Sequence, residues 1–289
     1  MHRAGFAILL LVGAACSDSE TPAGRLLDDA GVEIRLPAPP RRIVSLNPAT
    51  TELIFALGAG DRLVGRTTWC DYPEAAARVA DLGNGIGPNV EAVLGVAPDL
   101  VLLYRSGANA AAAGRLRGLG IPVLELRTDL LADLDRVIGL LGRVLGVQPA
   151  ADRLIAQIGS ETAAATRERS GGSAPTVFIL AWNRPPLTLG RGSFLSEILD
   201  RAGARNLFAD LAAPSAPVSI EAVARRDPDF ILTHSVDLPA FARLPEWQVV
   251  RAVRERRFLR VHGSEFNRPS PRIGRAISRL AALLDSLSR

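Results

Sequence analysis

The chain has 289 residues, of which 48% are apolar and 22% are charged. This composition is typical of a globular protein with a hydrophobic core, and it excludes a largely disordered chain. All 34 basic residues are Arg and 30 residues are acidic, so the formal net charge is only +4 although the pI is near 9.9. Because the Arg residues are scattered among carboxylates and never form a basic run with aromatic residues, a solvated surface is favoured over a nucleic-acid-binding one.

The first residues have the features of an export signal. A positive start, an apolar run over residues 4–12 that is too short to span a bilayer, and a small-residue cleavage site precede Cys16. We expect residues 1–15 to be a signal peptide and residues 16–24 to be a polar tether. This arrangement resembles a bacterial lipoprotein signal, in which Cys16 would be acylated and would hold the chain at a membrane. Plain cleavage after Ala15 is the alternative, and both routes export the protein to the periplasm or the cell surface.

Strand and helix patterns alternate through the first half of the chain. We expect a hairpin from residues 25–27 and 32–36, followed by strands at 41–46, 63–65, 100–103 and 122–126. Helices are expected from Asn47 and Pro48 to Gly58, and over residues 110–119. The apolar strands lack polar alternation, which is typical of parallel strands covered on both faces. The pattern predicts a parallel, doubly wound sheet.

One stretch of this region occurs twice. Residues 90–93, Val-Glu-Ala-Val, return as Ile-Glu-Ala-Val at 220–223, and the Pro-Asp pair that follows at 98–99 returns at 228–229. Each copy predicts a short helix that Pro ends and then a buried strand. Two copies of one helix–strand unit predict two lobes of similar build.

A long helix is expected between the two halves. A helix over residues 134–145, capped by Asp133, is followed by a helical pattern from about residue 149 to 169, which at 1.5 Å per residue spans roughly 30 Å. We therefore expect an N-terminal lobe at 25–146, a bridging helix at 147–170 and a C-terminal lobe at 171–289. In the C-terminal lobe we expect strands at 176–181, 230–232 and 258–261, and helices at 194–199, near 247–253 and at 271–287.

Known catalytic and metal-binding motifs are missing, so no catalytic residue, no metal site and no cofactor is expected. Aromatic residues instead follow predicted strands, where open α/β sheets bind ligands; they are Trp69, Tyr72, Tyr104, Trp182 and Phe266. Flat aromatic faces suit a large planar or conjugated ligand, and the alternative is that each ring packs in a core or between lobes. Cys70, beside Trp69, is expected to be a buried bystander, with a thiol contact to a bound metal as the alternative.

Several segments together resemble a known family. These segments are Val44–Glu52, Asp71-Tyr72-Pro73, the repeated Glu-Ala-Val with its Pro-Asp, and the run from Arg268 to Ile273. In this order they are similar to the helical-backbone solute-binding proteins of bacterial ABC importers, and most similar to their cobalamin-binding branch. The resemblance covers nearly all of residues 25–289. It implies two lobes with a ligand cleft between them, joined by a single long helix.

The resemblance also implies roles for individual residues. Trp69, Tyr72, Tyr104, Trp182, Phe266 and Arg268 would contact a corrinoid ligand in the cleft. Glu91 and Glu221, one per lobe, would dock on the two subunits of a permease, whereas without the resemblance both are ordinary first-turn carboxylates. The function implied is capture of cobalamin for an ABC importer. An iron-siderophore or haem binder of the same fold, and an exported two-lobed enzyme, are the alternatives.

Overall fold

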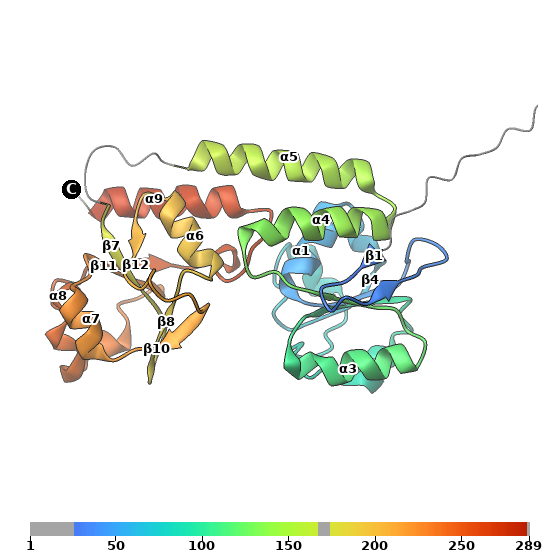
Figure 1. Cartoon of the computed structure of the whole chain (residues 1–289), viewed down its shortest axis with the longest axis horizontal. Helices are drawn as coiled ribbons and strands as arrows, with labels where there is room; N and C mark the ends of the chain where they lie inside the picture. Colours follow the sequence, from blue (N-terminus) through green and yellow to red (C-terminus); the bar gives the residue numbers. More distant parts are fainter. Residues whose placement is uncertain (1–25, 167–173, 288–289) are drawn as a thin grey trace, which may run out of the picture.

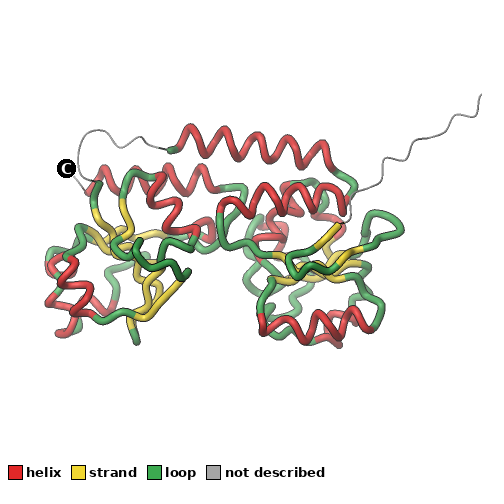
Figure 2. Tube along the Cα trace, viewed as in Figure 1, coloured by secondary structure: helices red, strands yellow, loops and turns green. Residues whose placement is uncertain are grey.

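The structure, a computed structural model, describes residues 26–166 and 174–287. Two α/β lobes lie side by side, each with one central sheet, and helix α5 (Gln148–Ala165) runs along both (Figure 1). Helices cover both faces of each sheet (Figure 2). The predicted fold class, two doubly wound α/β lobes joined by a long helix, is confirmed.

The sheet of the N-terminal lobe has four parallel strands in the order β4-β3-β5-β6. The strands are β3 (Ile43–Leu46), β4 (Leu63–Arg66), β5 (Leu100–Tyr104) and β6 (Val123–Leu126), as the sequence predicts. One face is covered by α1 (Pro48–Ala56) and α4 (Leu131–Leu145), and the other by α2 (Val90–Gly95) and α3 (Gly107–Gly118). Because side chains alternate along a strand, Leu102 packs with the first helix pair and Leu103 with the second. The predicted hairpin, β1 (Leu26–Leu27) with β2 (Glu33–Ile34), precedes this sheet.

The sheet of the C-terminal lobe is mixed. Its parallel strands are β7 (Thr176–Asn183), β11 (Phe230–His234) and β12 (Phe258–Val261), and the short β9 (Arg205–Asn206) pairs with the start of β7. Two antiparallel strands, β8 (Pro186–Leu189) and β10 (Ser215–Pro217), extend it beyond β7. The strand expected at 176–181 therefore continues to Asn183, and the chain returns as β8 instead of forming a loop at 182–186. Pro186 is the first residue of β8, where its missing N–H is tolerated. Because prolines are typical of loops, the sequence pattern did not indicate this hairpin.

Helices cover the C-terminal sheet in the same way. Its two faces carry α6 (Phe194–Arg201) with α9 (Ile273–Leu287), and α7 (Ile220–Arg226) with α8 (Arg251–Arg254). The single helix expected near 247–253 is instead a 3-10 turn, Pro245–Val249, followed by α8. Other 3-10 turns are Gly60–Arg62, Glu74–Arg78, Ala240–Arg243 and Ser264–Phe266.

Helix α5 packs on α4 of the N-terminal lobe and on α9 of the C-terminal lobe, which Figure 1 shows along one side of the molecule. Thr166 leaves the helical conformation with φ −71° and ψ 130°, so α5 ends earlier than the expected residue 170. Residues 167–170, and the lobe boundary expected there, lie outside the described residues. No helix within the described ranges is long and apolar enough to cross a membrane.

The largest core cluster continues from one lobe into the other. It includes Leu53 and Leu102 in the N-terminal lobe, Ile158 on α5, and Ile179 and Ile277 in the C-terminal lobe. All five side chains are at most 5% exposed. The two lobes therefore share one hydrophobic core through their helices, instead of meeting only at a linker.

The two copies of the repeat build matching units. Asn89 caps α2 by accepting from the backbone N–H of Ala92, and Ser219 caps α7 by accepting from that of Ala222, each at 3.1 Å. After each helix, the Pro-Asp carboxylate holds the neighbouring strand: Asp99 accepts from the N–H groups of Arg41 and Arg42, and Asp229 accepts from the N–H of Thr176. Each copy of the repeat thus supplies the residues that cap a helix and the carboxylate that holds a neighbouring strand.

Candidate functional site

A cavity of about 620 Å³ lies between the lobes. On the N-terminal side it is formed at the carboxyl ends of β3, β4, β5 and β6, where an open parallel sheet is expected to bind ligands. On the C-terminal side it is formed by the end of β8, the start of α6, residues 214–215 and residues 267–269. Its lining comprises Asn47, Pro48, Trp69, Asp71, Tyr104, Thr128, Asp129, Leu189, Gly192, Ser193, Phe194, Pro214, Ser215, Asn267, Arg268 and Pro269.

The N-terminal wall presents two aromatic rings. The indole of Trp69 is 62% exposed, which is unusual for so large an apolar side chain and leaves most of its face available to a ligand. The Tyr104 hydroxyl donates to Asp129 Oδ1 at 2.7 Å. Burial raises the pKa of Tyr104 to about 12, and the Asp129 carboxylate adds to that rise, so the hydroxyl stays protonated at neutral pH.

Leu189, Phe194 and Pro214 form the apolar part of the C-terminal wall. Two glycines allow this wall to form. A Cβ at Gly190 would collide with the carbonyl oxygens of Ala213 and Leu211, and one at Gly192 would lie 2.7 Å from the carbonyl oxygen of Ala212. The turn between β8 and α6 can therefore lie directly against residues 211–214.

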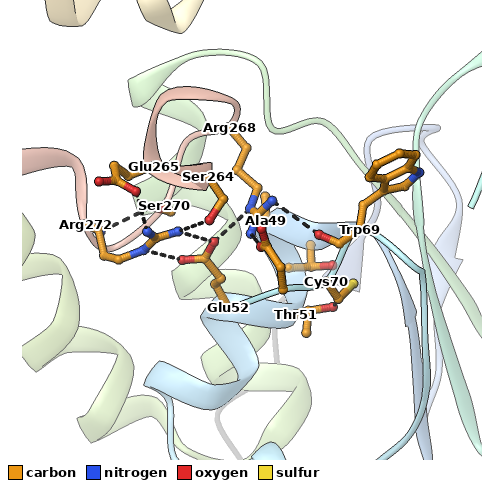
Figure 3. A network of polar contacts seen from close by, with 12 residues as sticks. Ala49, Thr51, Glu52, Trp69, Cys70, Ser264, Glu265, Arg268, Ser270 and Arg272 are labelled. Carbon is orange, nitrogen blue, oxygen red and sulfur yellow. Dashed lines mark hydrogen bonds and ion pairs between the residues drawn. The ribbon is translucent and has the colours of Figure 1, made fainter. Parts of the chain in front are cut away.

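Where the lobes meet, six charged side chains form what we call the interlobe ion-pair network: Glu52, Asp71, Glu265, Arg268, Arg272 and Arg279. Glu52, on α1, accepts from Arg268 Nε at 2.7 Å and from Arg272 Nε at 2.9 Å (Figure 3). The Glu52 side chain is 1% exposed. A buried carboxylate of one lobe is thus paired with two guanidinium groups of the other.

The outer members of this network complete the charge balance. Arg268 Nη2 donates to Asp71 Oδ1 at 2.5 Å, and Arg272 Nη1 donates to Glu265 Oε2 at 2.8 Å. Burial alone would raise the pKa of both carboxyls, but the hydrogen bond and charge of Arg268 hold the pKa of Asp71 below its ordinary value of 3.8. For Glu265, a backbone hydrogen bond and the charges of the Arg residues hold the pKa below 4.5. Both groups are ionised at neutral pH.

Three of the predicted ligand-contacting residues come together in the cavity. Trp69, Tyr104 and Arg268 all line it, and Arg268 Nη1 also lies 3.4 Å from the Trp69 carbonyl oxygen. Their contact with a ligand remains a prediction.

The other three predicted residues lie elsewhere. Phe266 is 1% exposed and belongs to the core, so its expected place in the pocket wall is corrected. Tyr72 lies under the Arg272 guanidinium, 3.8 Å from ring centroid to Cζ. Trp182 lies at the end of β7, 63% exposed, with its indole N–H donating to the Arg184 carbonyl. Neither Tyr72 nor Trp182 is among the residues that line the cavity.

The thiol of Cys70 also lies away from the cavity. It is 1% exposed and contacts the hydroxyls of Thr51 and Thr67 at 3.1 and 3.2 Å. The alternative of a thiol contact with a bound metal is therefore not supported. Within the described ranges, no group of three His, Cys, Asp or Glu side chains is arranged to hold a metal ion.

Glu91 and Glu221 lie outside the cavity, exposed in the first turns of α2 and α7. Glu91 pairs with Arg115 at 2.6 Å, with both side chains more than half exposed. A hydrogen bond to its own backbone and one from Ser219 lower the pKa of Glu221. Both carboxylates are exposed to solvent, and neither lines the cavity.

Sequence reasoning missed several lining residues. Asn47 directly follows β3, and Thr128 and Asp129 lie in the loop from β6 to α4, so the strand-end rule that selected the aromatic residues also applies to them. The sequence also carried no indication that Asp71 and Glu265 pair with Arg residues. Nothing in the sequence indicated that Glu52 forms ion pairs, and only its place among the buried residues of α1 sets it apart.

Comparisons with known proteins are consistent with this architecture. The family model described as "Periplasmic binding protein" matches residues 43–264. The vitamin B12-binding protein of Yersinia pestis (strain Pestoides F) is 33% identical over 256 residues, which cover 85% of this chain and 87% of that protein.

Two solved structures have the same fold. The periplasmic heme-binding protein of Roseiflexus sp. RS-1, in its apo form, is 26% identical with a TM-score of 0.77, over 86% of this chain and 99% of that one. The periplasmic vitamin B12-binding protein of Vibrio cholerae is 27% identical with a TM-score of 0.71, over 87% and 99%.

Proposed function

The chain belongs to the periplasmic binding protein family, and we propose that it is the exported substrate-binding component of an ABC importer that captures cobalamin or a related corrinoid and delivers it to a permease. The observation that carries this proposal is the cavity between the lobes, with the exposed Trp69 indole on one wall and the apolar Leu189, Phe194 and Pro214 on the other. The vitamin B12-binding relatives support the choice of ligand. The protein would bind its ligand without chemical change.

The arrangement suits a flat macrocycle with polar groups at its edge. A conjugated ring system could lie against the face of Trp69, because such offset stacking and area burial are both favourable. Polar side chains at the ends of the strands, among them Asn47, Thr128 and Ser215, would meet groups at the edge of the ring. A few placed polar groups around apolar walls are typical of small-molecule sites.

A calorimetric titration of the purified mature protein tests the proposal. Cyanocobalamin, haem and a ferric siderophore would be titrated in parallel, and we expect cyanocobalamin to bind tightest. Absence of cyanocobalamin binding at micromolar concentration would overturn the proposal.

Haem is the second candidate, because the heme-binding protein of Roseiflexus shares the fold over nearly its whole length. Haem carries propionate carboxylates, which favour free guanidinium or ammonium groups. The same titration decides between the two ligands, since they would compete for one cavity.

We propose that Glu91 and Glu221 dock on the permease. Their support is structural equivalence, since each is exposed in the first turn of a capped helix, one per lobe. Figure 1 shows α7 and α3, on which α2 packs, on the side of the sheets away from α5. Two matched carboxylates would suit a partner with two related subunits.

Charge reversal tests this role. Glu91→Arg and Glu221→Arg should leave ligand affinity unchanged and should weaken permease binding and transport. Asp152→Arg, an exposed carboxylate on α5, is the matched control and should affect neither. Normal transport by the double Glu variant would refute the docking role.

Lipid attachment at Cys16 is also a proposal, since Cys16 lies outside the described residues. Mass spectrometry of the N-terminal peptide would detect the acyl chains. A Cys16→Ala variant should be recovered without lipid, and an unmodified N-terminus in the unaltered protein would show plain cleavage.

A further inference from the structure

The charges around the cavity bear on which ligands it accepts. Among the described residues that line it, Arg268 is the only basic one, whereas Asp71 and Asp129 are acidic. A site for an anionic chelate would be expected to have unpaired guanidinium groups facing the ligand. Whether Arg268 is available for this purpose therefore decides the matter.

Three of the five N–H groups of Arg268 donate within the protein, and two carboxylates balance its charge. Its Nε donates to Glu52, its Nη2 donates to Asp71, and its Nη1 donates to the Trp69 carbonyl oxygen, at 2.7, 2.5 and 3.4 Å. Its side chain is 12% exposed. A ligand carboxylate at Arg268 would meet a guanidinium whose charge Glu52 and Asp71 already balance, and freeing that charge by separating Arg268 from the buried Glu52 is costly.

The two acidic side chains accept hydrogen bonds at the cavity. Asp129 accepts from the Tyr104 hydroxyl through Oδ1, and its Oδ2 lies 3.8 Å from Nε of Arg127, whose side chain is 57% exposed. Asp71 is 60% exposed and holds Arg268 with Oδ1. An ionised carboxylate can accept several hydrogen bonds, so both groups can take further donors. A ligand carboxylate at the same place would be repelled.

From this geometry we propose that Asp129 and Asp71 determine ligand specificity by accepting N–H donors: the cavity selects a macrocycle with neutral carboxamides at its edge and discriminates against the same macrocycle bearing carboxylates. This inference rests on the proposed function, since it names the groups by which a corrinoid would be recognised. For the same reason a haem, which carries propionates in place of amides, would be a poor ligand.

The test compares corrinoids that differ only in this group. Cyanocobalamin and its monocarboxylic acids, in which one peripheral amide has been hydrolysed, would be titrated calorimetrically at neutral pH. We expect at least one acid isomer to bind roughly tenfold more weakly than the amide, because a like charge is placed opposite a carboxylate. Added salt should reduce this ratio, because the site is partly open to solvent.

Matched variants assign the effect to its residues. Asp129→Asn and Asp71→Asn remove the charge while keeping an acceptor, so each should lower the acid-to-amide ratio of Kd values for the isomer it faces. Asp152→Asn on α5 makes the same change of net charge and should leave the ratio as it is. Near-ultraviolet circular dichroism would show that the variants are folded.

The outcomes separate the two proposals. If no corrinoid binds, the proposed function is wrong. If the amide binds and every acid isomer binds equally well, or if the ratio is the same in both cavity variants as in the unaltered protein, the function stands and the specificity inference is overturned.

Discussion

The interlobe ion-pair network predicts a large effect for one isosteric change, Glu52→Gln. The Glu52 carboxylate accepts three hydrogen bonds, one from Arg268 and two from Arg272, and the side chain is 1% exposed. Gln has nearly the same volume, but it has no charge and turns an N–H₂ group toward guanidinium donors. The variant therefore removes the pairing without opening a cavity.

The size of the effect follows from burial. Removing one partner of a buried ion pair costs about 3–5 kcal/mol. Arg268 keeps Asp71 and Arg272 keeps Glu265, so we expect the lower end, about 3 kcal/mol. In a chain of this size each kcal/mol lowers Tm by about 2–4 °C, which gives a fall of about 6–12 °C.

The assay is thermal unfolding followed by circular dichroism, with urea unfolding as a second measure. Asp210→Asn is the matched control, because Asp210 also pairs with an Arg through both oxygens, at 2.7 and 2.8 Å, but is 58% exposed. An exposed ion pair contributes much less than a buried one, because solvent screens its charges. If Glu52→Gln lowers Tm no more than Asp210→Asn does, the network does not stabilise the contact between the lobes.

Three further predictions concern the cavity, acid stability and the repeat. Trp69→Ala should weaken cobalamin binding, because a ligand that covers about 100 Å² of the indole gains about 2.5 kcal/mol, roughly 60-fold in Kd. Trp182→Ala is the control, since the Trp182 side chain is 63% exposed against 62% for Trp69. Equal losses of affinity in the two variants would show that the cavity does not define the site. Because the pKa values of Asp71 and Glu265 are lowered in the folded protein, the unfolded chain takes up protons at higher pH than the folded one. The stabilisation from these two carboxylates should therefore be complete above about pH 5 and lost as the pH falls below about 4. Urea midpoints that stay constant from pH 5 to pH 3 would contradict this. Asp99→Asn should cost about 1–3 kcal/mol in urea unfolding, since hydrogen bonds from two backbone N–H groups lose a charged acceptor, and Asp229→Asn should have a similar effect if the two copies are equivalent.

The repeating units were predictable because their signals are local. Apolar spacing, cap residues and Pro positions lie within a few residues of the structure they determine, as in α2 with β5 and α7 with β11. The expectation that ligands bind at the carboxyl ends of strands also predicted Trp69 and Tyr104, and both line the cavity. Placing these two residues requires only the direction in which each strand runs through a parallel sheet.

What the sequence did not reveal depends on distant residues. Glu52 and Arg268 are 216 positions apart, so nothing near either residue indicates the pairing. Phe266 has the local pattern of a loop residue at a strand end, and only its packing with the core shows that it is buried. Strands β8 and β10 contain or adjoin prolines that are typical of loops, and their pairing becomes evident only when the sheet is assembled.

The core that the two lobes share has a consequence for how the protein comes apart. Helices α4, α5 and α9 have most of their apolar residues in that one cluster, so separating the lobes would expose it in both halves. One helix–strand unit is repeated in the two halves, yet neither half is a self-sufficient module. The chain should therefore unfold in a single cooperative transition, and a fragment ending after α5 should aggregate or stay unfolded unless the other half is supplied with it.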